Sequence, residues 1–413
     1  MSMLSCRLPE IPRNHTVPHI PESHTLYVGP SSCMRRHAIH AREYGDIEEV
    51  TFLRITQADV VSGSYEDLIE AAVGELLRTL NPVPRIMFIE LFCIDDFLGT
   101  DDESLVDRLS RAFPDCRFVT DHIHPVATNE TVSMSEMKFF NQYAFVERAA
   151  PEDRDGGINV IGAFVPINPA SELVAALDSM GATPLRYLFG CKTFDEYQDM
   201  GKSQFALVTR EMSRTAAEDM RARLGIPYLA FPACYDVAEI GDTYAELSSA
   251  LGKSLPHELL NPWRARAQAA VEDALEATSG IPLAIDCEAS LVPHSLARAL
   301  LDYGFNVKWI FRSKHLFDTD ALDRERLMTF YPRVTIMCAD DARLVAGGAE
   351  TLTADAGASS ILAIGKDAGH ILGTPYCVDI WHDEGFTGYH GICSLMELMK
   401  DQALRIKHDR KVG

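Results

Sequence analysis

The chain has 413 residues, a formal net charge of −22, and 47% hydrophobic and 24% charged residues. Such a length is typical of two or three globular domains, and so acidic a chain is unsuited to bind the phosphate backbone of nucleic acid. The sequence has no apolar run of about 18 residues and no leader with a charged and then an apolar region, so we expect no membrane partner and a cytoplasmic location.

The N-terminal 24 residues hold four prolines and predict an extended arm, residues 1–24, that carries Cys6. From residue 25 onward, apolar runs such as "LYVGP", "VTFLRI", "RIMFIELF" and "RFVTDHI" alternate with helical patterns. Strands that are apolar on both faces and alternate with helices predict a parallel sheet covered on both sides. These elements form the first predicted α/β domain, residues 25–155.

The charged segment "PEDRDGG" (151–157) predicts a domain boundary, after which the same alternation begins again. Runs such as "INVIGAFV" and "QFALVTR" predict the strands of a second α/β domain, residues 156–278. After the long helical segment "NPWRARAQAAVEDALEATSG", runs such as "IPLAIDC" and "NVKWIFR" predict a third α/β domain with its C-terminal segment, residues 279–413. The predicted fold class is therefore α/β, with three Rossmann-like domains built on doubly wound parallel sheets.

The chain has no Walker A loop and no GxGxxG motif after a strand, so we expect it to bind no nucleotide itself. In doubly wound sheets, ligands bind beyond the carboxyl ends of the strands. Strand-end residues are therefore the first candidates for a site: Cys33, Cys93, His122 and His124 in the first domain, Cys191, Thr209, Arg210 and Cys234 in the second, and Cys287, Arg312, Cys338 and residues 370–390 in the third.

Ten cysteines are present without a Cys-x-x-Cys pair, which excludes zinc-finger spacing. Cys33 follows a Gly-Pro turn at a predicted helix start, where the helix dipole favours a thiolate. Cys93 holds a similar place in its own strand–turn–helix unit, and Cys6 lies on an arm that can fold back to the same sheet edge. On these residues alone, three convergent iron-binding thiolates and three unrelated core cysteines are equally open alternatives.

The order of these cysteines, with "GPSSC" around Cys33 and an acidic stretch after Cys93, resembles the nitrogenase component 1 superfamily. Two later segments are also similar to that superfamily. They are "QFALVTREMSRTAAEDMRARLGIPYLAF" (204–231), which is similar to its second-domain unit, and "HDEGFTGYHGICSLMELMKD" (382–401), which is similar to its aromatic-rich C-terminal segment. The resemblance covers nearly the whole chain.

The resemblance implies that Cys6, Cys33 and Cys93 bind an iron–sulfur cluster, a [4Fe–4S] cluster or a larger eight-iron cluster, at a subunit interface. Three cysteines do not complete the usual four-thiolate set. The resemblance therefore implies a second component 1 subunit, in a homodimer or a homologous heterodimer, or an oxygen ligand such as Asp95 or Asp96. It also implies an ATP-hydrolysing iron protein as the electron donor.

Two positions depart from the molybdenum–iron proteins of that superfamily. Thr209 stands where their cofactor cysteine is expected, and His382 is offset by one residue from their cofactor histidine. Since a threonine does not replace a thiolate on iron, we expect neither that cofactor nor dinitrogen reduction. The corresponding cavity would take an organic substrate, with His390, His382 and Arg210 as catalytic residues; its expected lining is Thr209, Arg210, Arg312, His370, Trp381, His382, Tyr389 and His390.

Four other histidines have two interpretations each. His37 and His40 share a helix face with Cys33, and either tune the cluster and donate protons or lie at an ordinary surface or interface. His122 and His124 alternate in direction at a strand end, so only one of them would face a site, and a structural role is equally open.

The sequence thus predicts the catalytic component of a nitrogenase-like reductase, an iron–sulfur oxidoreductase. It would pass low-potential electrons to a small molecule such as a tetrapyrrole, an organosulfur compound or another unsaturated compound. One alternative is a cofactor-assembly scaffold that holds a metal-cluster precursor without turnover. Another is a small-molecule binding module with no cluster.

Overall fold

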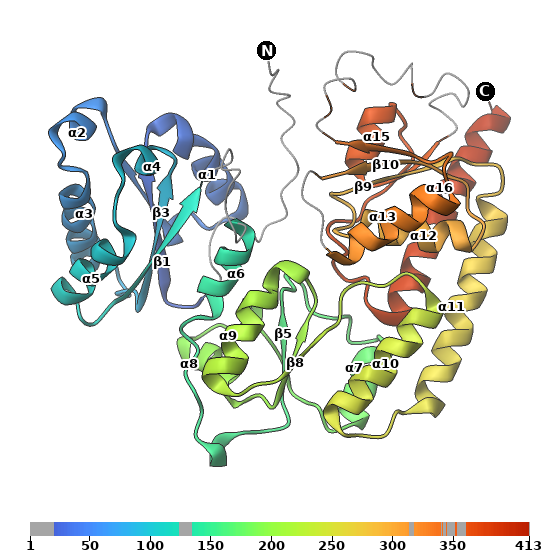
Figure 1. Cartoon of the computed structure of the whole chain (residues 1–413), viewed down its shortest axis with the longest axis horizontal. Coiled ribbons are helices and arrows are strands. Elements are labelled where there is room, and N and C mark those ends of the chain that lie inside the picture. Colours follow the sequence, from blue (N-terminus) through green and yellow to red (C-terminus); the bar gives the residue numbers. More distant parts are fainter. Residues whose placement is uncertain are drawn as a thin grey trace. The chain divides into compact units, whose positions relative to one another are not determined.

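The computed structural model describes residues 20–123, 134–313, 318–339, 341, 344, 352 and 361–412. In this part of the chain, the strands form three sheets, and every strand pairing is parallel (Figure 1). Helices connect the strands, so the predicted α/β class with parallel sheets is confirmed. Within the same residues, no helix combines the length and the apolar character that crossing a membrane requires.

The chain divides into two compact units. The first, here called the two-sheet unit, ends at Phe164 and resumes over Pro184–Ala230. The second, here called the one-sheet unit, comprises Val165–Thr183 and the chain from Phe231 onward. Each predicted domain holds the strands of one sheet, apart from the first two residues of the first strand. The predicted boundaries at residues 24, 155 and 278 stay predictions.

The first sheet of the two-sheet unit has the strand order β2-β1-β3-β4. Its elements are β1 (Ser23–Gly29), α1 (Ser31–Tyr44), η1 (Ile47–Glu49), β2 (Val50–Arg54), α2 (Gln57–Ser62), α3 (Tyr65–Thr79), β3 (Ile86–Phe92), α4 (Ile94–Leu98), α5 (Asp102–Ala112), β4 (Arg117–Ile123) and α6 (Met134–Tyr143). The inner strand β3 is buried along its whole length, as an apolar run flanked by helices predicts. Helices α3 and α5 pack on one face of this sheet and α1 on the other (Figure 1).

The second sheet of the same unit has the order β6-β5-β7-β8. Its elements are η2 (Pro151–Asp153), β5 (Ile158–Ile161), β6 (Leu185–Tyr187), η3 (Leu188–Gly190), α8 (Phe194–Gln198), η4 (Asp199–Lys202), β7 (Phe205–Val208), η5 (Glu211–Ser213), α9 (Arg214–Leu224) and β8 (Tyr228–Ala230). Strands β5 and β7 are fully buried and therefore form the centre of this sheet.

The one-sheet unit has a sheet of order β11-β10-β9-β12-β13. Its elements are α7 (Glu172–Ser179), α10 (Val237–Leu251), α11 (His257–Ala277), β9 (Leu283–Asp286), α12 (Pro293–Asp302), β10 (Val307–Arg312), α13 (Asp318–Phe330), β11 (Thr335–Cys338), β12 (Leu362–Ile364), α15 (Lys366–Leu372), β13 (Cys377–Val378) and α16 (Gly388–Val412). The two long helices α11 and α16 pack along each other (Figure 1). This packing holds the start of α16, which carries His390, against the rest of the unit.

Candidate functional site

Two of the three candidate cluster cysteines lie at the carboxyl edge of the first sheet. Strands β1 and β3 are neighbours, with Val28 opposite Leu91. Cys33 is the third residue of α1, which follows β1, and Cys93 directly follows β3 as the N-cap of α4. Both cysteines are partly buried. The structure thus brings them to the ends of adjacent strands, whereas Cys6 lies outside the described residues.

The turn that leads into α1 explains the "GPSSC" pattern. A Cβ atom on Gly29 would lie 2.7 Å from Cδ2 of Phe92, so only glycine fits between the ends of β1 and β3. Pro30 is the N-cap in extended conformation, and no side chain of the described residues caps this end of α1, whose first turn also holds no acidic residue. The partial positive charge at the helix start is therefore left to act near Cys33, which favours an anionic group there.

His37 packs as a neutral ring one turn along α1 from Cys33. Its ring centroid lies 4.9 Å from that of Tyr27 and 5.4 Å from that of Phe92, the latter in an edge-on arrangement. Burial, aided by the nearby charge of Lys138, lowers the pKa of His37 to about 3. The structure therefore favours a packed histidine over a proton-donating imidazolium at neutral pH.

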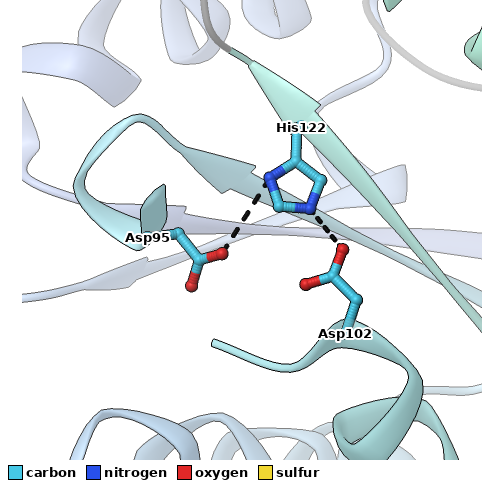
Figure 2. Close-up of side chains that lie close together, drawn as sticks. All are labelled: Asp95, Asp102 and His122. Carbon is cyan, nitrogen blue, oxygen red and sulfur yellow. Dashed lines mark hydrogen bonds and ion pairs between the residues drawn. The ribbon is translucent and has the colours of Figure 1, made fainter. Parts of the chain in front are cut away.

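Three polar side chains meet at the same edge of the first sheet, as Figure 2 shows. Nε2 of His122, on β4, is hydrogen-bonded to Oδ2 of Asp102, the first residue of α5. Nδ1 of His122 lies 3.9 Å from Oδ2 of Asp95 on α4. The left-handed residue Gly99, with φ of 65°, ends α4 and turns the chain toward α5. We call Asp95, Asp102 and His122 the edge triad.

The sequence singled out His122 as a strand-end residue and Asp95 as a possible oxygen ligand, but it did not predict the edge triad. The signal that could have found it is two aspartates, each in the first two residues of a helix, near a strand-end histidine. Asp95 is only 1% exposed. Burial raises its pKa, and the charge of Asp102 adds to that shift. His124, the other histidine of "TDHIHP", lies outside the described residues.

A buried ion pair lies within the first sheet. Nζ of Lys138, on α6, donates to both carboxylate oxygens of Glu90 at 3.0 and 2.9 Å. Glu90 on β3 is opposite Asp121 on β4, which accepts a hydrogen bond from Nδ2 of Asn141 at 2.6 Å. Burial, followed by the charge of Glu90, raises the pKa of Asp121 to about 7. These residues were not predicted from the sequence, although a glutamate inside the apolar run "IMFIELF" was a visible signal.

Thr209 and Arg210 lie at the carboxyl end of β7 in the second sheet. Oγ1 of Thr209 donates to the carbonyl oxygen of Ile161 at 3.1 Å, so the threonine side chain binds the backbone of the neighbouring strand. Arg210 is buried, and its guanidinium carbon lies 4.6 Å above the ring of Phe164. The structure thus places Arg210 at a strand end as a buried side chain packed on an aromatic ring.

His390 lies at the start of α16 in the one-sheet unit. Its Nε2 atom is 3.3 Å from Nδ2 of Asn168, and its ring centroid is 5.8 Å from that of Trp263. The backbone N–H of His390 donates to Oε2 of the buried Glu172 at 3.0 Å, and the hydroxyl of Tyr244 donates to Oε1 at 2.8 Å. Glu172 thus fixes the helix start that carries His390, a role that was not predicted from the sequence.

His382 is held in an unusual backbone conformation. His382 and Asp383 have φ values of 45° and 61°, in the left-handed region. The ring of His382 stacks on Trp381 with a centroid distance of 4.1 Å, and its Nε2 atom lies 3.6 Å from Oε2 of Glu288. His382 and His390 belong to the one-sheet unit and Arg210 to the two-sheet unit. Their shared catalytic role stays a prediction.

For most of the remaining cysteines in the described residues, burial indicates a packing role. It raises the thiol pKa of six of them, which keeps them protonated as small packing groups: Cys116, Cys191, Cys234, Cys287, Cys377 and Cys393.

The comparisons with known proteins agree with this architecture. The family model described as nitrogenase component 1 type oxidoreductase matches residues 16–403. The chain belongs to this family. Its members generally bind iron–sulfur clusters, form oligomers and work with an iron protein. A search of curated protein sequences finds no match.

Among solved structures, this family member is similar in fold to two described as nitrogenase Cp1. The one at pH 6.5 has a TM-score of 0.70 and 16% identity, and the match covers 94% of this chain and 90% of that chain. The one at pH 5 has a TM-score of 0.58 and 14% identity, with 93% of this chain and 85% of that chain covered. The resemblance seen in the sequence is thereby confirmed at the level of family and fold.

Proposed function

We propose that this chain is the catalytic component of a nitrogenase-like reductase of the cytoplasm, and that Cys33, Cys93 and Cys6 hold an iron–sulfur cluster. The observation that carries the proposal is the placement of Cys33 and Cys93 after adjacent strands, beside the uncapped start of α1. Thiolates are the usual protein ligands of such clusters. When bound, the cluster supplies one-electron transfer at low potential.

The residues of this chain give the cluster its surroundings. Cys33 lies against the apolar group of Tyr27, Met34 and Phe92, which limits the access of water. Arg35 and Arg36 are exposed on α1 close to Cys33 and are available to an acidic partner surface. We propose that the ATP-hydrolysing iron protein docks near them, and that a second component 1 subunit, identical or homologous, supplies the ligands that this chain lacks.

The substrate in this proposal is a small unsaturated molecule, such as a tetrapyrrole or an organosulfur compound. His390, His382 and Arg210 are its proposed catalytic residues. His390 and His382 each hold a ring between an aromatic neighbour and a polar neighbour. Arg210 offers a buried cation for a polar substrate group. Position 209 is a threonine whose hydroxyl donates to a backbone carbonyl, so this position offers no thiolate to a metal cofactor.

The test is anaerobic purification followed by iron and acid-labile sulfide analysis, and by EPR spectroscopy of the dithionite-reduced protein. We expect the wild type to hold iron and sulfide, and Cys33→Ala and Cys93→Ala to lose the larger part of both, because each removes a thiolate ligand. Cys116→Ala is the matched control, since Cys116 is a buried thiol in the core of the same sheet. It should keep the wild-type iron content.

Three outcomes contradict the proposal. If the wild type holds no iron even after reconstitution with iron and sulfide, the chain is a binding module without a cluster. If Cys33→Ala and Cys93→Ala keep the iron content of Cys116→Ala, the cluster ligands lie elsewhere. Should the protein hold a second metal cofactor and pass it to another protein without turnover, it is an assembly scaffold and not a reductase.

A further inference from the structure

The edge triad contains the kinds of atoms that bind a divalent metal ion. One ligand atom from each of Asp95, Asp102 and His122 lies within 4.8 Å of the other two. Figure 2 shows both carboxylates turned toward the imidazole ring. One imidazole nitrogen and two carboxylate oxygens suit Zn²⁺, Mn²⁺ or Fe²⁺. Ca²⁺ and Mg²⁺ favour sites made of oxygen atoms alone.

The burial of Asp95 is the second observation that points to a ligand. Its side chain is 2% exposed, and Oδ1 accepts no hydrogen bond from the described residues. The nearest approach of Oδ2 to His122 Nδ1 is 3.9 Å, which is beyond hydrogen-bond length. Since nearly all buried polar atoms in folded proteins have a partner, this buried Oδ1 atom needs an explanation.

The charge of the edge triad is also unbalanced. In the described part of the chain, neither Asp95 nor Asp102 pairs with a lysine or an arginine, and the imidazole of His122 lies within ion-pair distance of both carboxylates. A second atom, Oδ1 of Asp102, is likewise buried and accepts no hydrogen bond there. Two carboxylates at one imidazole leave a net negative group, which a bound cation would neutralise.

We propose that Asp95, Asp102 and His122 form a binding site for a divalent transition-metal ion, separate from the cysteine site. The three ligands come from α4, α5 and β4. A bound ion would therefore fix both helical turns that follow Cys93 to the neighbouring strand. His122 and Asp102 are 25% and 31% exposed, which leaves the ion a path from solvent.

The test uses the anaerobically purified full-length protein and Mn²⁺ as the probe, because Mn²⁺ prefers oxygen and nitrogen ligands to thiolates. Binding is measured by the loss of the EPR signal of the free ion during titration. We expect the wild type to bind roughly one Mn²⁺ per chain at this site, and Asp95→Asn, Asp102→Asn and His122→Gln each to bind at least about tenfold more weakly.

Asp101→Asn is the matched control, since it makes the same change one residue away. Asp101 caps α5 by accepting from the backbone N–H of Ser104 at 3.1 Å, and asparagine caps helices equally well. It should bind Mn²⁺ as the wild type does. Circular dichroism checks that each variant is folded, and Asp102→Asn is the mildest variant because Asp102 is partly exposed at a helix start.

Two results overturn the metal site: a wild type that binds no Mn²⁺ at millimolar concentration, or triad variants that bind it as tightly as Asp101→Asn. Iron analysis keeps this proposal distinct from the cluster proposal. Asp102→Asn should retain its iron and sulfide, whereas Cys33→Ala should lose iron and still bind Mn²⁺.

Discussion

Asp95 and Asp286 are both buried aspartates at the carboxyl ends of parallel strands, yet their surroundings differ. Asp286 ends β9, and its carboxylate accepts backbone N–H groups from Ala368, Ala289 and Glu288 at 2.6, 2.7 and 3.0 Å. A Cβ atom on Gly365 would lie 2.1 Å from Oδ2 of Asp286, so this approach requires a glycine. Because both carboxylate oxygens already accept hydrogen bonds from the backbone, they have little capacity to bind a ligand. Asp286 therefore has a structural role.

Asp95 is as deeply buried, but no backbone group of the described residues satisfies Oδ1. Burial of an acid at a strand end is therefore not enough to mark a site. The two aspartates differ in their hydrogen-bond donors. Donors reach both carboxylate oxygens of Asp286, whereas Oδ1 of Asp95 has none among the described residues. Substitutions at the two edges should consequently affect stability in different ways.

The largest expected effect is that of Asp286→Ala. It leaves three backbone N–H groups without their acceptor, and we expect the free energy of unfolding to fall by about 3–5 kcal/mol. Asp286→Asn should cost less, because its amide oxygen can still accept from Ala289 and Glu288. Urea unfolding monitored by circular dichroism measures both values. An Asp286→Ala variant as stable as the wild type would show that these hydrogen bonds do not hold the edge together.

The second-largest expected effect on stability concerns His37, which packs against Tyr27 and Phe92 near Cys33. The pKa of His37 is about 3 in the folded chain and about 6.5 when unfolded, so the unfolded state takes up a proton first as the pH falls. This contribution to stability is complete above pH 6.5 and is lost progressively toward pH 3. Between pH 7.5 and pH 5 the loss should reach about 2 kcal/mol.

His37→Phe tests this expectation because it keeps an aromatic ring between Tyr27 and Phe92 but removes the titrating group. Its stability should fall less on acidification than that of the wild type, by the same amount. His408→Gln is the comparison variant, since it removes a histidine that is 75% exposed on α16. Equal pH profiles for His37→Phe and the wild type would contradict the low pKa of His37.

The structure also shows which features of the fold can be predicted from the sequence. The run "RIMFIELF" (85–92) predicts β3, which spans Ile86–Phe92, and "GPSSC" predicts a helix start, which the structure places at Ser31. Both depend on local hydrophobic pattern and turn chemistry, which the sequence contains directly. The predicted lining of a cavity, by contrast, combined residues from both compact units, and it stays a prediction.

Contacts between segments far apart in the sequence could not be predicted from local patterns. Asp102 and His122 are 20 positions apart, and they meet because Gly99 turns the chain from α4 into α5 while β3 pairs with β4. Glu172 is 218 positions from His390, and it binds the start of α16 from α7. No local pattern marks such partners, because the path of the whole chain brings them together.

The smallest effect on stability should come from Asp95→Asn. This variant distinguishes most clearly between the role of Asp95 and that of Asp286. Burial raises the pKa of Asp95, so the wild type loses stability as the pH rises above the ordinary pKa of an aspartate, while the unfolded chain ionises freely. In EDTA at pH 7, the variant should therefore match the wild type within about 1 kcal/mol or exceed it. Adding Mn²⁺ should then raise the midpoint of thermal unfolding more for the wild type than for Asp95→Asn, because the protein with all three ligands gains more binding energy in the folded state. If Asp95→Asn instead costs as much in EDTA as Asp286→Ala, then Asp95 is a structural acid like Asp286, and the difference in donor supply has no functional meaning.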